Sequence, residues 1–162
     1  MGYTGISSEW RGAMNLGDSA QMTSILHRGD TLEKLLRDCS DYRVSTLPVM
    51  DAEGQISGAV SLYDLLAKMM LPDYLVKAAH VLGDEAVALH DIEPDMAHWC
   101  RLPIDEHITQ KYYVVTPESS LTKGLALMAD KDSTCLFVVD KSGQYRGIVT
   151  RITIAQRLLD KL

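Results

Sequence analysis

The sequence is poor in aromatic residues, cysteine and positive charge, and each shortage narrows what the chain can be. Only one of its 162 residues is Phe and two are Trp, so a core must consist mainly of aliphatic side chains and Met. A formal net charge of −6 argues against nucleic acid as a partner, because phosphate binding needs a basic surface. The three cysteines, Cys39, Cys100 and Cys135, form no C-x-x-C pair, which is typical of reduced thiols in the cytoplasm.

Several functional signatures are also missing. No apolar run approaches the roughly 18 residues that a membrane span needs, and the first ten residues lack the layout of a signal peptide. The sequence has no phosphate-binding P-loop, no glycine-rich dinucleotide motif and no Ser/His/Asp set in a catalytic frame. We therefore expect a cytoplasmic protein that binds no membrane and is not an enzyme.

What the sequence does contain is an internal repeat. When the chain is shifted by 89 residues, residues 31–66 align without a gap on residues 120–155, and 11 of these 36 positions are identical. The identities keep two glycine pairs in register, Gly54 with Gly143 and Gly58 with Gly147. Such a match indicates two copies of one supersecondary unit.

Each copy predicts the order strand, helix, strand, hairpin, strand, helix. Short strands are expected near residues 23–26 and 112–115, and helices after the N-caps Thr31 and Ser120. Apolar strands at 47–50 and 136–139 lead through Asp-x-x-Gly turns into strands at 55–60 and 144–149, and then into helices at 62–70 and 152–162. This predicts an α+β fold whose two copies pack sheet to sheet about a pseudo-two-fold axis, with clefts between them.

The residues that carry the repeat resemble a known family. Leu47-Pro-Val-Met-Asp-x-x-Gly54, followed by Gly58-Ala-Val-Ser61-Leu-Tyr-Asp64, is similar to the core of a cystathionine-β-synthase-type (CBS) domain, and the second copy is similar too. The resemblance assigns residues 18–70 to CBS repeat 1, 71–107 to a helical linker and 108–162 to CBS repeat 2. Two such repeats form a Bateman module, which often dimerises and binds AMP, ADP, ATP or S-adenosylmethionine.

The resemblance also implies a ribose-binding signature, Gly-h-x-[Ser/Thr]-x-x-Asp, where h is apolar. Repeat 1 keeps it in Gly58, Ser61 and Asp64, so the Asp64 carboxylate is expected to accept hydrogen bonds from the ribose hydroxyls near a helix N-terminus. Repeat 2 has Thr153 at the Asp position, and a Thr cannot replace a bidentate carboxylate. We expect one adenosyl site and a degenerate second cleft.

The remaining site residues follow from the family's geometry. The base is expected beside Ser45, Thr46 and Leu47, with Thr23 and Ser24 closing the pocket. Arg151 is the first candidate for binding a phosphate, ahead of Arg43 and Arg28. The plainer alternatives stay open: Ser61 and Asp64 could be only an N-cap and a first-turn acid, Ser45 and Thr46 ordinary strand residues, and Arg151 a solvated side chain.

The segment between the repeats predicts a helix over residues 76–89 and a short one over 95–101, with Trp99 as an anchor. It is rich in His, Asp and Glu, but the spacing fits no zinc pattern, so we expect no metal. The leading hypothesis is a homodimeric sensor of an adenosine-containing ligand whose state is read by a protein effector. The alternative is a ligand-free structural or protein-interaction (dimerisation) module.

Overall fold

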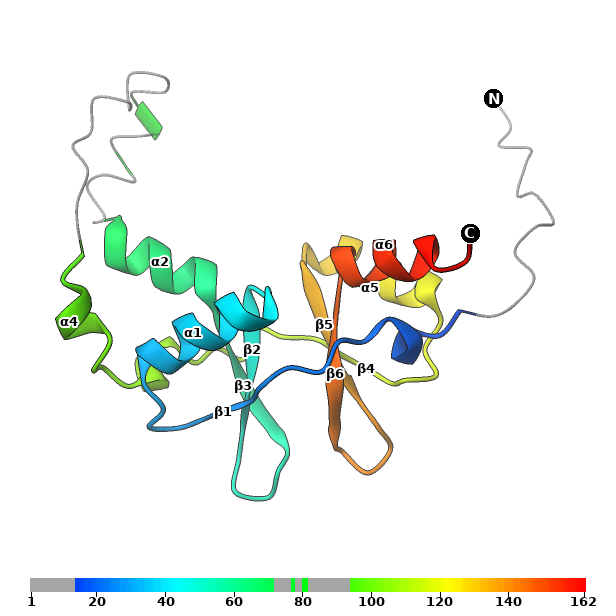
Figure 1. Cartoon of the computed structure of the whole chain (residues 1–162), viewed down its shortest axis with the longest axis horizontal. Helices are drawn as coiled ribbons and strands as arrows, with labels where there is room; N and C mark the ends of the chain where they lie inside the picture. Colours follow the sequence, from blue (N-terminus) through cyan, green and yellow to red (C-terminus); the bar gives the residue numbers. More distant parts are fainter. Residues whose placement is uncertain (1–13, 72–76, 78–79, 82–93) are drawn as a thin grey trace. The chain divides into compact units, whose positions relative to one another are not determined.

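The computed structural model describes residues 14–71, 77, 80, 81 and 94–162 (Figure 1). The chain forms two compact units. Unit 2 is Thr23–Tyr112 and contains repeat 1; unit 1 joins Met1–Met22 to Tyr113–Leu162 and contains repeat 2. Each unit therefore holds most of one repeat, together with a segment that ends within the first few residues expected for the other repeat.

The order of elements in each repeat confirms the predicted α+β fold. Repeat 1 runs β1 (Leu26–His27), α1 (Leu32–Tyr42), β2 (Thr46–Met50), β3 (Ile56–Ser61) and α2 (Leu62–Met70), followed in unit 2 by α4 (Met96–Trp99) and the 3-10 helix η3 (Ile104–His107). In unit 1 the 3-10 helix η1 (Leu16–Ser19) precedes β4 (Val114–Val115), α5 (Leu121–Lys131), β5 (Cys135–Val139), β6 (Tyr145–Thr150) and α6 (Arg151–Leu159). The helix expected over 95–101 is present as α4, and the one expected over 76–89 lies outside the described residues.

Each unit holds a three-stranded sheet of mixed direction. In unit 2 the order is β1-β2-β3, with β1 parallel and β3 antiparallel to β2; in unit 1 it is β4-β5-β6 with the same directions. The predicted hairpin turns are present: Asp51 Oδ1 accepts hydrogen bonds from the backbone N–H groups of Glu53 and Gln55, and Gly54 supplies a φ of 76°. Packing of one sheet on the other stays a prediction.

The helices begin where the sequence predicts and cover the sheets with aliphatic side chains. The Thr31 and Ser120 hydroxyls accept hydrogen bonds from the backbone N–H groups of Lys34 and Lys123, which caps α1 and α5. The strand positions that are identical in the two copies are core positions, and their side chains are buried in both units: Leu47 and Leu136, Val49 and Val138, Val60 and Val149. The repeat thus preserves the side chains that its own helices bury.

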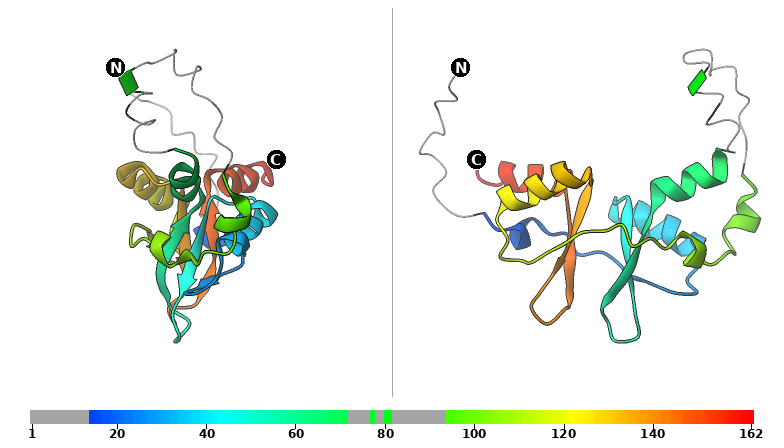
Figure 2. Two further views of the ribbon diagram at one scale, coloured as in Figure 1. Left: turned by 90° about the vertical axis from the view of Figure 1, so that its left-hand side faces the viewer. Right: turned by 180° about the vertical axis from the view of Figure 1, so that it is seen from behind.

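A segment without regular strand structure closes the free edge of each hairpin. We call residues 14–22 the first strap and residues 104–112 the second strap. Gln21 of the first strap exchanges two backbone hydrogen bonds with Ile148 of β6, at 2.9 and 2.8 Å. Thr109 of the second strap exchanges two with Ala59 of β3, at 2.9 and 3.0 Å, and Figure 2 shows this strap crossing β3. The outward backbone groups of Ala59 in β3 and Ile148 in β6 thereby find partners.

The glycines next to these pairs permit the close approach of the straps. A Cβ on Gly147, whose φ is 129°, would lie 2.6 Å from the Gln21 carbonyl oxygen. A Cβ on Gly58 would lie 2.5 Å from Ile108 Cγ2, which is the end of a side chain and can move. The shared glycine of the repeat therefore has a packing role in both copies, whatever binds nearby.

Gly147→Ala tests this role. It should lower the free energy of unfolding by about 3 kcal/mol, because a positive φ and a backbone clash act together. Gly54→Ala is the matched control, since its φ is also positive but no atom lies within 4 Å of the added Cβ; it should cost only about 1 kcal/mol. Urea unfolding followed by circular dichroism measures both, and equal losses would contradict the clash.

Candidate functional site

The predicted site residues of repeat 1 gather at one end of the unit 2 sheet. Because β1 and β2 run parallel and β3 runs antiparallel to them, β1 and β2 start at the same end of the sheet at which β3 finishes. Thr46 and Ser61 are directly paired across β2 and β3. The Ser45 carbonyl accepts a hydrogen bond from Leu62 N–H at 2.8 Å, which ties the start of β2 to the start of α2.

Ser61 and Asp64 form the N-terminus of α2. The Ser61 hydroxyl oxygen accepts a hydrogen bond from Asp64 N–H at 3.3 Å, so Ser61 is the N-cap. The Asp64 side chain is exposed, and among the described residues its carboxylate has no hydrogen-bond or ion-pair partner. The helix dipole favours a negative charge there. Ser61 is therefore an N-cap, as the alternative without a ligand also predicts. This cap uses the backbone N–H of Asp64 and leaves the Asp64 carboxylate available to a ligand.

The matching position of repeat 2 is built differently. Thr150 caps α6 by accepting from Thr153 N–H at 3.2 Å, and the Thr153 hydroxyl accepts from Thr150 N–H at 2.9 Å. The two residues form a capping box. The Thr153 hydroxyl also donates to the Thr150 carbonyl at 3.0 Å. The Thr153 hydroxyl thus takes part in capping the N-terminus of α6, whereas the Asp64 carboxylate takes no such part at α2.

A polar network that the sequence did not predict lies beside the site. The Ser24 hydroxyl donates to Asp38 Oδ2 at 2.7 Å, and Lys34 Nζ forms an ion pair with the same oxygen and donates to the Ile25 carbonyl at 3.2 Å. Burial tends to raise the pKa of Asp38, but the hydrogen bonds from Lys34 and Ser24 and the Lys34 charge together hold it below its usual value. The i, i+4 spacing of Lys34 and Asp38 is the sequence signal that could have found this pair.

The other predicted residues differ in what they can offer a ligand. The Leu47 side chain is fully buried, so only its backbone could face a ligand. Thr23 is 7% exposed and its hydroxyl donates to the Ser24 carbonyl at 2.9 Å. Arg151 belongs to unit 1, where it is the exposed first residue of α6, and the ion pairs found among described residues do not include it. Arg28 pairs with Asp105 at 3.7 Å.

The described part of the chain contains neither a cluster of metal-ligating residues nor a membrane-spanning helix. No group of three or more His, Cys, Asp or Glu residues within it is arranged to hold a metal ion. Most of the acidic and His-rich stretch between the repeats, including Asp84, Glu85, His90 and Asp91, lies outside the described residues. None of the helices described has the length and apolar character needed to cross a membrane.

Comparison with known proteins identifies the class of this fold. The sequence matches the CBS domain family over residues 24–71 and 104–160, which together make up more than half of the chain. The chain therefore belongs to the CBS domain family, as a tandem pair. The family match indicates no enzyme family.

Similar proteins extend over almost the whole chain. The uncharacterized protein MJ1426 of Methanocaldococcus jannaschii is 22% identical, with 90% of this chain and 92% of that protein covered. A CBS domain-containing protein of unknown function from Bacillus anthracis has a TM-score of 0.64 at 19% identity, covering 92% of this chain and 95% of the other. CBSX2, a CBS-pair protein of Arabidopsis thaliana whose structure was solved in complex with AMP, has a TM-score of 0.62 at 22% identity, covering 90% and 96%.

The Asp38 network predicts a pH dependence of stability. Because the folded pKa of Asp38 lies below its ordinary value of 3.8, its ionised form stabilises the fold above that pH, and this contribution is lost as pH falls through the folded pKa. The stability difference between the wild type and Asp38→Asn should be constant above about pH 5 and shrink below about pH 4. Urea unfolding at several pH values measures it.

Lys34→Met is the control for the cause of this effect. Without the ammonium group, the pKa of Asp38 should move up toward its ordinary value, and the same Asp38→Asn comparison should depend less on pH. An unchanged profile in the Lys34→Met background would show that the ion pair does not set the pKa of Asp38.

Proposed function

We propose that this CBS pair is a regulatory module that binds an adenosine-containing ligand at the end of the β1-β2-β3 sheet. The Asp64 carboxylate binds the ribose hydroxyls, and the module's output passes to a protein effector. The observation that carries the proposal is the contrast at the third position of the two equivalent helices: the Asp64 carboxylate has no partner among the described residues, whereas the Thr153 hydroxyl completes a capping box.

The chemistry of the first turn of α2 suits a ribose. Two carboxylate oxygens can accept from two neighbouring hydroxyls, and hydrogen bonds to a charged acceptor are stronger than neutral ones. The Ser61 oxygen accepts from Asp64 N–H, so its own proton is free to be donated to the ligand. A nucleoside would thus meet one donor and one anionic acceptor within a single helical turn.

The Asp38 network adds a preference for the base. The Ser24 hydroxyl gives its proton to Asp38, so toward a ligand its oxygen can only accept. Such a group favours a donor such as the exocyclic amine of adenine. The AMP complex of CBSX2 supports an adenine nucleotide as the first ligand to test, with ADP, ATP and S-adenosylmethionine as the other candidates.

Asp64→Asn should weaken AMP binding by about 100-fold, the equivalent of losing about 3 kcal/mol from two charge-assisted hydrogen bonds. Isothermal titration calorimetry measures the affinity, and Glu33→Gln is the control for loss of a first-turn acid elsewhere in the unit, since Glu33 is half-buried on α1 and pairs with Arg37. In the wild type 2′-deoxy-AMP should bind more weakly than AMP, and this difference should vanish in Asp64→Asn. A difference that persists would contradict ribose binding by Asp64.

Arg151 keeps its proposed role of binding a phosphate. Arg151→Gln should weaken AMP binding and leave adenosine binding unchanged, since adenosine has no phosphate. If AMP, ADP, ATP and S-adenosylmethionine all failed to bind folded protein, the ligand-free interaction module would become the better hypothesis.

The second helices of the two repeats favour a further role in dimerisation. Tyr63 of α2 is 74% exposed, and Ile152, its equivalent on α6, is 78% exposed. Met70 and Leu159, seven residues further on, are an equivalent pair and also exposed. Spacing of seven residues returns to the same helix face, so each helix presents an apolar stripe at matching positions. We assign these stripes to contact with a second copy of the chain.

Substitution of the stripes tests the homodimer. Tyr63→Lys and Ile152→Lys, made together, should shift the protein toward monomer, because two charges would be buried on association. Sedimentation velocity measures the oligomeric state. Met22→Lys is the control, since Met22 is 57% exposed but lies outside both helices. A wild type that is monomeric at every concentration, or a dimer that survives the double substitution, would refute the assignment.

A further inference from the structure

A second candidate site lies in unit 2, away from the N-terminus of α2. A pocket of about 160 Å³ is lined by residues of α2, α4, η3 and the turn between the last two: Lys68, Trp99, Leu102, Pro103, Glu106 and His107. Lys68 is in the last turn of α2, whereas Asp64 is in the first. The described residues that line it all belong to this one unit.

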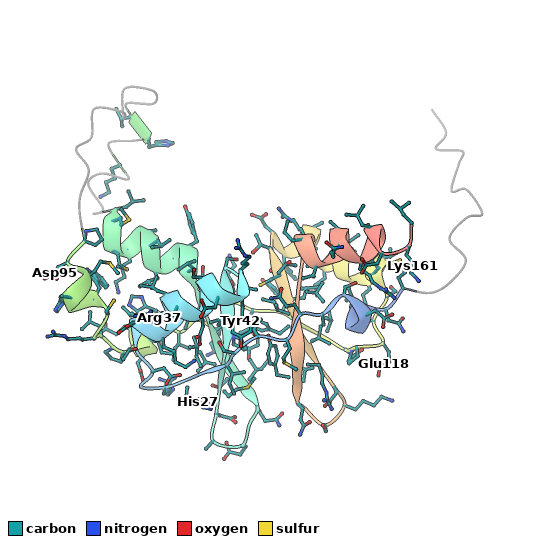
Figure 3. All side chains as sticks on the ribbon, in the orientation of Figure 1. His27, Arg37, Tyr42, Asp95, Glu118 and Lys161 are labelled. Carbon is teal, nitrogen blue, oxygen red and sulfur yellow. The ribbon has the colours of Figure 1, made fainter. Side chains whose placement is uncertain are left out.

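The wall and floor of this pocket are held by capping and by backbone hydrogen bonds. Asp95, labelled in Figure 3, caps α4 by accepting from His98 N–H at 3.1 Å. The Leu102 carbonyl accepts from Leu32 N–H at 2.9 Å, and Ile104 N–H donates to the Asp30 carbonyl at 2.8 Å. These bonds fasten the turn that carries Leu102 and Pro103 to the start of α1. The pocket is therefore a built feature of the fold.

The pocket is lined by one basic side chain, Lys68, one acidic side chain, Glu106, and the imidazole of His107. Lys68 forms none of the ion pairs found within the described ranges, and neither does Glu106. Burial and the nearby Lys68 charge lower the pKa of His107, and Glu106 opposes this in part. At neutral pH the pocket thus offers one cation, one anion and an uncharged imidazole.

The remaining wall is apolar and the space is small. Trp99, Leu102 and Pro103 supply an indole ring and aliphatic surface. The volume is below the roughly 300–1,000 Å³ of pockets that hold drug-sized ligands, so a much smaller molecule is required. A fitting ligand carries a negative group for Lys68, a positive group for Glu106 and a short apolar body for Trp99.

We propose that this pocket binds a free apolar α-amino acid. Its carboxylate pairs with Lys68, its ammonium group with Glu106, and its side chain packs on Trp99 and Leu102. The proposal is independent of the adenosyl site, because it uses none of the residues assigned to that site. It would give the CBS pair a second input of different chemistry.

The test uses L-leucine as the probe and the full chain carrying Trp10→Phe, so that Trp99 is the sole tryptophan. Leucine should change Trp99 fluorescence saturably with a Kd on the order of 1 mM. Two analogues, 4-methylpentanoate without the amine and 3-methylbutylamine without the carboxylate, should each bind about 10-fold more weakly. The His107 proton resonances, followed by NMR, should show a higher pKa when leucine is bound, because its carboxylate offsets the Lys68 charge.

Variants locate the binding. Lys68→Gln should weaken leucine binding about 10-fold, and Lys123→Gln, which removes an exposed lysine of α5, should leave it unchanged. Calorimetry with AMP on Lys68→Gln separates this site from the proposed adenosyl site, since AMP affinity should stay at the wild-type value. No saturable response to leucine, equal binding of leucine and 4-methylpentanoate, or an undiminished affinity in Lys68→Gln would each overturn the proposal.

Discussion

The pairing of each strap with a hairpin edge is the constraint on which the rest of the structure depends. Two backbone hydrogen bonds join Thr109 to Ala59, and two join Gln21 to Ile148. The chain therefore passes from one unit to the other twice. Near residue 22 it runs from the first strap into the sheet that begins with β1, and near residue 112 from the second strap into the sheet that begins with β4. A repeat cut out along its sequence boundaries would lose the segment that covers its outermost strand. Unit 1 is consequently discontinuous in sequence, joining Met1–Met22 to Tyr113–Leu162, whereas unit 2 is the continuous stretch Thr23–Tyr112.

This exchange explains which parts of the fold the sequence could predict. Helices, strands and turns follow from local signals, such as the Thr31 cap and the Asp51-to-Gly54 turn, and the structure confirms them. The straps carry no such signal, because Gln21 and Thr109 donate and accept through backbone groups that every residue type except Pro has. The only sequence feature that reflects the straps is the glycine that each approaches, Gly58 or Gly147. That glycine is also the first residue of the ribose-binding signature, so the sequence alone suggests a different role for it.

The candidate site shows the same division between local and long-range information. The positions of Ser61 as the N-cap and Asp64 in the first turn of α2 could be predicted because they lie within four residues of each other. The hydrogen bond from Ser24 to Asp38 could not be predicted, since 14 residues separate them and it forms only where α1 lies beside the chain that precedes β1. The difference between Asp64 and Thr153 was visible as a loss of charge, but its structural consequence was not. Thr153 lacks the carboxylate of Asp64, and in addition its hydroxyl stabilises the N-terminus of its own helix, α6.

The two proposed sites of unit 2 share physical elements, and this determines how they could influence each other. Helix α2 carries Asp64 in its first turn and Lys68 in its last. The second strap carries His107 at the pocket and, two residues later, Thr109 paired with the strand that ends at Ser61.

A ligand at either site therefore acts on the same helix and the same strap. If occupancy of one site shifts these elements, thermodynamic linkage requires that each ligand change the other's affinity by the same factor. Equal factors measured by titrating leucine with and without AMP, and AMP with and without leucine, would establish the coupling. Factors of one in both directions would show that α2 and the second strap hold the sites without connecting them.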